Sequence, residues 1–95
     1  VVNRSLDKEI QVETSRMIKE SIVYALSNID EALDYAMEFS RGVSRDTARE
    51  FVLMYVNNDT LDLKDRGLDA LNYMYEASLK KGLINQMIEI DLIST

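Results

Sequence analysis

The absence of proline is the feature that most constrains this chain. No proline occurs among its 95 residues, and the only glycines are Gly42, Gly67 and Gly82. Proline breaks the interior of a helix and glycine weakens it, so little in this sequence interrupts helical structure. Apolar residues recur at spacings of three, four and seven, which is typical of one face of a helix. We therefore predict an all-α chain of about four helices that pack like a bundle.

Capping residues divide the chain into helical segments. Asn28 and Glu31 form a capping-box pattern, and Ser44 is a favourable N-cap. Gly42 and Gly82 suit the left-handed conformation that often ends a helix. The predicted helices cover residues 7–27, 28–41, 44–57 and 62–82, with a tail at 83–95.

The length allows one small domain. A chain of this mass hides roughly 65% of its surface on folding, which supports one modest core. We expect residues 1–95 to form a single helical domain or a fragment of a larger protein. The helix at 44–57 has apolar residues around most of its circumference, so we expect other elements to cover it on most sides. The chain starts with Val1 rather than methionine, and Val1-Val2 is typical of a strand end, which favours a C-terminal fragment. The alternation from Ile88 to Leu92 predicts an extended segment or a short strand.

The charge balance and the missing residue types exclude several function classes. Lys and Arg number 11 and Asp and Glu number 17, for a net charge of −6, which disfavours binding to nucleic acid. No apolar run reaches the length of a membrane span and no signal peptide is visible, so we expect a cytoplasmic protein without membrane attachment. The chain has no cysteine and no histidine, which removes thiolate chemistry, the commonest general base and the commonest metal ligand.

Searches for cofactor and metal motifs lead to the same expectation of no cofactor and no metal. The three glycines are too far apart for a phosphate-binding loop or a dinucleotide fingerprint. Residues 62–67 contain the aspartate and glycine of a calcium loop, but Lys64 and Arg66 stand where oxygen ligands belong. Glu9 and Glu13 lie one helical turn apart, and we interpret them as part of a solvated face.

The stretch Tyr-Val-Asn-Asn-Asp-Thr-Leu-Asp-Leu at residues 55–63 is the most specific motif. It resembles a signature of the 1,4-dihydroxy-6-naphthoate synthase family, which acts in the futalosine route to menaquinone. The segments 21–26 and 31–35 resemble the two helices that precede this signature, and the resemblance continues to Ile84. The sequence departs from the family at Lys64, where members often have glycine, and at residues 39–41, where many have His-Ala-Gln.

The resemblance implies a parent protein with the two-lobed α/β fold of type 2 periplasmic binding proteins. Members of the family are lyase-type enzymes that close over a cyclic futalosine derivative and cleave it, with a histidine as the base. This chain would be the helical C-terminal part of such an enzyme. Its partners would be the remaining N-terminal part and a small-molecule substrate, and its catalytic residues would lie outside the chain. Whether the chain by itself is an enzyme, folds alone or forms a homo-oligomer stays open.

Two interpretations of the motif remain. In the first, Asn57 adopts a left-handed conformation after one helix, Asp62 caps the next, and the motif is a helix–loop–helix clasp. In the second, Tyr55 or Asn57 faces the substrate cleft and is a candidate substrate-binding residue. An alternative function for the whole chain is a non-catalytic helical module, which binds a ligand or self-associates within a periplasmic-binding-protein-like protein.

Overall fold

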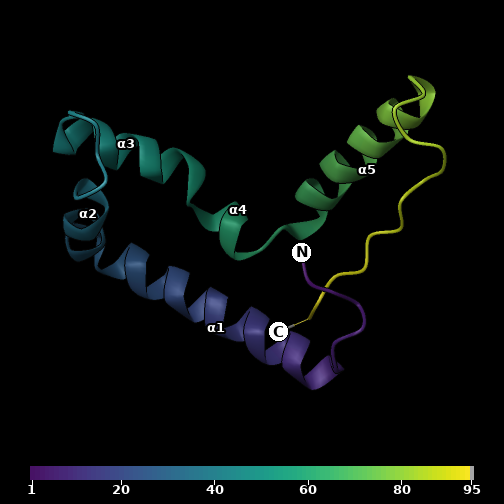
Figure 1. Cartoon of the computed structure of the whole chain (residues 1–95), viewed down its shortest axis with the longest axis horizontal. Helices are drawn as coiled ribbons and strands as arrows, with labels where there is room; N and C mark the ends of the chain where they lie inside the picture. The colour runs from purple at the N-terminus through teal and green to yellow at the C-terminus, as the bar shows by residue number, and fades with distance from the viewer. Residues whose placement is uncertain (95) are drawn as a thin grey trace.

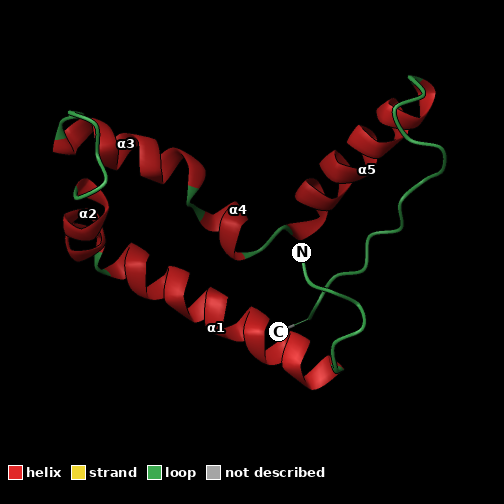
Figure 2. Cartoon of the chain, in the orientation of Figure 1, coloured by secondary structure: helices red, strands yellow, loops and turns green. Residues whose placement is uncertain are grey.

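The computed structural model describes residues 1–94, which form helices joined by short connections (Figure 2). The helices are α1 (Lys8–Ser27), α2 (Ile29–Met37), α3 (Arg45–Tyr55), α4 (Asn58–Leu61) and α5 (Lys64–Lys80). No strand occurs within the part of the chain that the structure describes. This confirms the all-α prediction, with a fifth, very short helix where a turn was expected.

The helices form an open arrangement rather than a bundle (Figure 1). The chain follows α1, turns back through α2 and α3, and then diverges along α5. The radius of gyration is 17.0 Å, whereas a compact domain of this length has about 12 Å. The exposed surface is 8073 Å², whereas a compact protein of this mass exposes about 5,600 Å². The predicted bundle-like packing is therefore wrong for this chain.

Very little of the chain is buried. Leu33 of α2 is the only buried hydrophobic residue among those described, at 1% exposure. The main helix contacts are α1 with α2, α2 with α3, and α1 with α4, and α5 makes no comparable contact with another helix. The prediction that residues 44–57 are covered on most sides is also wrong, because no element packs over Phe51 or Met54 on the outer face of α3.

Charged groups join α2 to the start of α3. The Arg45 guanidinium donates to the Asp34 carboxylate at 2.7 Å and to the Asp30 carbonyl oxygen at 2.8 Å. Ser44 caps α3 as predicted, because its hydroxyl accepts the Thr47 amide at 3.2 Å. The Arg45 side chain is 43% exposed, so its ion pair with Asp34 contributes modestly to stability.

Two predictions for the second helix, its capping box and its end, differ from the structure, although Asn28 does occupy the N-cap position. Asn28 does not cap it with its side chain, which instead donates to the Tyr24 carbonyl oxygen, and Glu31 accepts the Tyr24 hydroxyl at 3.0 Å. The nearly continuous run of α1 into α2 gives Asn28 this nearer partner. The helix ends at Met37 rather than residue 41, although Gly42 does adopt a positive φ of 82° in the following loop.

The two ends of the chain lie near each other. Gly82 ends α5 at a φ of 71°, as predicted, and the loop after it leads back toward the N-terminal segment (Figure 1). There the Arg4 guanidinium forms an ion pair with Asp91 at 3.0 Å and reaches the Glu89 carbonyl oxygen at 3.4 Å. Across residues 1–94, no helix is long and apolar enough to cross a membrane.

Candidate functional site

The motif at residues 55–63 forms a turn of helix between α3 and α5, and its polar side chains bond mainly to backbone. The Asn57 amide group donates to the Met54 carbonyl oxygen at 3.1 Å, and its oxygen accepts the Asp59 amide at 3.0 Å. The Thr60 hydroxyl accepts a hydrogen bond from the Asn57 backbone N–H at 3.2 Å and donates to the Tyr55 carbonyl oxygen at 3.0 Å. These bonds satisfy groups that the end of α3 and the start of α4 would otherwise leave unpaired.

The geometry of this clasp differs from the sequence-based prediction. Asn57 is extended, with a φ of −148°, and is the N-cap of α4, so the left-handed conformation predicted for it is wrong. The left-handed residue is Lys64, at a φ of 54°. The prediction that Asp62 caps α5 is also wrong, because Leu63 occupies the N-cap position; the Asp62 carboxylate instead accepts the Lys64 backbone amide at 3.1 Å. Helix α5 consequently begins two residues later than predicted, and a glycine would adopt the Lys64 conformation with less strain.

Tyr55, the other candidate from the sequence, is 65% exposed at the end of α3. Its ring packs against that of Phe51, with the ring centres 4.9 Å apart. This pair lies one helical turn apart on an open surface rather than in an enclosed site.

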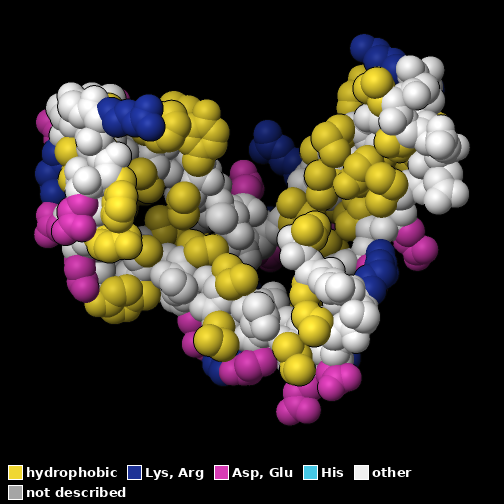
Figure 3. All heavy atoms as spheres, viewed as in Figure 1, with side chains coloured by type: hydrophobic (Ala, Val, Ile, Leu, Met, Phe, Trp, Pro, Cys, Tyr) yellow, Lys and Arg dark blue, Asp and Glu magenta, His cyan; other side chains and the backbone are white. Residues whose placement is uncertain are grey.

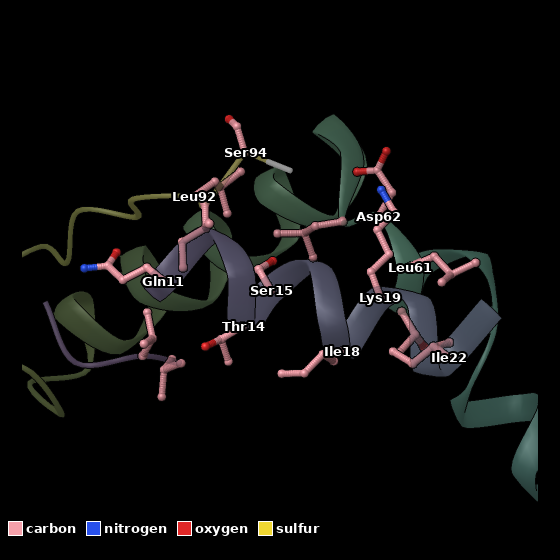
Figure 4. Close-up of a pocket in the computed structure, with 15 residues that line it drawn as sticks. Gln11, Thr14, Ser15, Ile18, Lys19, Ile22, Leu61, Asp62, Leu92 and Ser94 are labelled. Atoms are coloured by element: carbon pink, nitrogen blue, oxygen red, sulfur yellow. The ribbon is translucent and has the colours of Figure 1, made fainter. Parts of the chain in front are cut away.

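A cavity of about 570 Å³ lies beside the second half of the motif (Figure 4). Four parts of the chain surround it: α1, the α4–α5 junction, and the two terminal segments. Thr60, Leu61, Asp62 and Leu63 line it from the motif, whereas Tyr55 and Asn57 are not among its lining residues. Tyr55 and Asn57 therefore lie outside the lining of this cavity, and their contact with substrate stays a prediction.

The α1 side of the cavity mixes apolar and polar residues. Ile18 and Ile22 supply apolar surface, and Thr14, Ser15 and Lys19 supply hydroxyl and ammonium groups. Lys19 extends from α1 toward the loop that holds Asp62 (Figure 4), but no ion pair joins the two side chains. The sequence analysis missed these α1 residues, because only the fold brings them next to the motif. The apolar periodicity of α1 gave no signal for this face, because four of its six lining residues are polar: Gln11, Thr14, Ser15 and Lys19.

Three charged groups of α1, Glu13, Arg16 and Glu20, form a solvated ion cluster that does not line the cavity. Arg16 bonds to Glu13 and lies 2.6 Å from a carboxylate oxygen of Glu20. The hydrogen bond from Arg16 lowers the pKa of Glu13. In turn, Glu13 and Glu20 raise the pKa of Arg16. Near the end of α1, Tyr24 donates a hydrogen bond to Glu31 of α2, and this bond raises the pKa of Tyr24. None of these groups converges with a second acid or base on one enclosed position.

No group of three or more metal-ligating side chains comes together within residues 1–94. The chain also lacks histidine and cysteine. Within residues 1–94 the arrangement places hydroxyl groups, the Lys19 ammonium group and the Asp62 carboxylate around one hollow.

A sequence model of a menaquinone biosynthesis family matches residues 1–79. The chain belongs to this family. The match includes the whole motif at residues 55–63 and the two helices before it, which are the segments that carried the resemblance. No curated protein matches the chain.

A solved structure shows the same helical arrangement within a longer chain. A crystal structure of a protein from Archaeoglobus fulgidus is 43% identical in sequence, with a TM-score of 0.83. The similarity covers 87% of this chain and 31% of the Archaeoglobus chain, so this chain spans about a third of the relative that it matches. The open arrangement of helices is thus similar to one that exists inside a larger protein.

Proposed function

We propose that this chain is the helical C-terminal segment of a menaquinone biosynthesis enzyme similar to 1,4-dihydroxy-6-naphthoate synthase. The longer enzyme would be a lyase that cleaves a cyclic futalosine derivative and releases dihydroxynaphthoate. The observation that carries the proposal is the match to a menaquinone biosynthesis family over residues 1–79, which includes the motif at 55–63 that resembles the signature of the synthase family. In this proposal the enzyme has a two-lobed fold like type 2 periplasmic binding proteins and acts in the cytoplasm.

The division of labour follows from what the chain contains. Catalysis in the family uses a histidine, and this chain has none, so the base would come from the remaining N-terminal part of the enzyme. The chain would contribute structure: the hydrogen bonds of Asn57 and Thr60 hold α4 against the end of α3. The cavity between α1 and the α4–α5 junction would then be closed by the rest of the protein.

The test is to express the longer protein that carries this sequence and to incubate it with the cyclic futalosine derivative. Chromatography with mass detection should show dihydroxynaphthoate, and the 95-residue chain alone should give none. A longer protein that binds the derivative without converting it would contradict the proposal and favour the non-catalytic ligand-binding module. If the chain self-associates and the longer protein neither binds nor converts the derivative, the non-catalytic self-associating module is favoured.

A further inference from the structure

Helix α5 carries an apolar surface that the described chain does not cover. Its polar residues follow one stripe at spacings of three and four: Asp65, Asp69, Asn72, Glu76 and Lys80. Apart from Lys64 and Arg66 at its start, the remaining circumference is apolar or small. A helix that is apolar over so much of its circumference is typical of a buried position. Yet α5 makes no comparable contact with another helix.

Two sides of this apolar circumference differ in exposure. Leu68, Leu71 and Tyr75 are half-buried. On the other side, Tyr73 is 74% exposed and Met74 is 48% exposed. Figure 3 shows hydrophobic side chains gathered over this arm of the molecule. We define the α5 stripe as Ala70, Tyr73, Met74 and Ala77, which recur at spacings of three, four and seven and so share one face of the helix.

We propose that the α5 stripe is a docking surface for the part of the longer enzyme that precedes this chain, an inference that rests on the proposed function above. The small residues Ala70 and Ala77 let another backbone approach closely, and Tyr73 and Met74 supply the contact area between them. The polar stripe through Asp69 and Glu76 stays in water in the docked state.

The surface area supports a large intramolecular partner. The chain exposes about 2,500 Å² more than a compact protein of its mass, whereas a partner in a standard interface buries about 800 Å². The Archaeoglobus relative has the same helical arrangement in a chain of which this segment covers only 31%, so most of that chain is available to pack on these helices.

A second copy of this chain fits the α5 stripe less well. A single helical stripe would bury only part of the excess area, and it would leave exposed residues of α3 such as Phe51 and Met54 without cover. Each copy also carries a net charge of −6, so two copies repel each other at low salt.

The absence of cysteine from this chain gives a direct test by thiol labelling. Met74→Cys places a thiol on the α5 stripe, and Glu76→Cys places the matched control on the polar stripe of the same helix. Each is made in the longer protein, and labelling of the unsubstituted protein gives the background. We expect a maleimide to label Met74→Cys about tenfold or more slowly than Glu76→Cys, because the docked face reacts only after local opening. Ala70→Cys, which adds little volume, should be protected in the same way.

Equal labelling rates at positions 74 and 76 in the longer protein would overturn the docking surface, even if that protein produces dihydroxynaphthoate. Conversely, protection at position 74 in a protein that makes no product would leave the docking surface standing and defeat the proposed function. Protection that disappears on dilution, together with a change from dimer to monomer in light scattering, would assign the stripe to a second copy and also overturn the proposal.

Discussion

Replacement of Asn57 by alanine tests whether the motif at 55–63 is a clasp. The substitution removes two hydrogen bonds, one to the Met54 carbonyl oxygen at 3.1 Å and one from the Asp59 amide at 3.0 Å. Each such bond contributes about 0.5–1.5 kcal/mol net, and loss of an N-cap costs about 0.5–2 kcal/mol. Because both bonds are solvent-exposed, we expect a loss of about 1–2 kcal/mol in the free energy of unfolding.

The assay is thermal unfolding of the longer protein, followed by circular dichroism. The described chain buries only Leu33, so by itself it lacks the core that a cooperative transition needs. A loss of this size lowers the melting temperature by about 2–8 °C in a protein of 150–250 residues. Asn58→Ala is the matched control, because Asn58 is the next residue in the same turn and its side chain makes no hydrogen bond within residues 1–94.

Turnover measured on the same variants decides between the two interpretations of the motif. A clasp acts on folding, so Asn57→Ala should keep the KM and kcat of the folded enzyme close to those of the parent. If Asn57→Ala leaves the melting temperature at the value of Asn58→Ala but abolishes turnover, the clasp reasoning is refuted. Asn57 would then be a substrate-binding residue.

Three further predictions concern other parts of the chain. Lys64→Gly should stabilise the longer protein or leave it unchanged, by about 0–1 kcal/mol in chemical denaturation, because relief of the left-handed strain offsets the extra chain entropy of glycine; a clear loss of stability would contradict this. Arg45→Gln removes the ion pair with Asp34 at 2.7 Å and should increase amide hydrogen exchange in α2 without a change in α5. The Glu13 carboxyl should titrate below an ordinary glutamate in NMR spectra, because Arg16 stabilises its charged form. Because the pKa of Glu13 is lowered, the contribution of the Glu13–Arg16 pair to folding stability is fully present above the ordinary glutamate pKa and is lost as the pH falls through the lowered pKa. Arg16→Gln should return the Glu13 titration to that of an ordinary glutamate.

The sequence by itself determined the helical nature of this chain and several helix ends. The absence of proline left α1 and α5 without an interior break, and local chemistry fixed the Ser44 cap and the positive φ of Gly82. The motif at residues 55–63 also carried the family assignment. The helices and their ends depend on residues within a few positions of each other, where helix propensity and capping decide the outcome.

The tertiary structure decided which faces are covered and where the hollow lies. The apolar stripes predicted a bundle with one core, but periodicity shows only that a face needs cover and does not identify what covers it. In the structure α5 diverges from the other helices, and Thr60 to Leu63 meet α1 across a cavity that no sequence spacing predicts. Two local details also differed from prediction: the Asn28 side chain bonds to the Tyr24 carbonyl oxygen four residues away, and the left-handed residue is Lys64, whose amide bonds to the Asp62 carboxylate, rather than Asn57. The open packing and the cavity, in contrast, depend on contacts between segments distant in sequence, and only the folded chain brings those segments together.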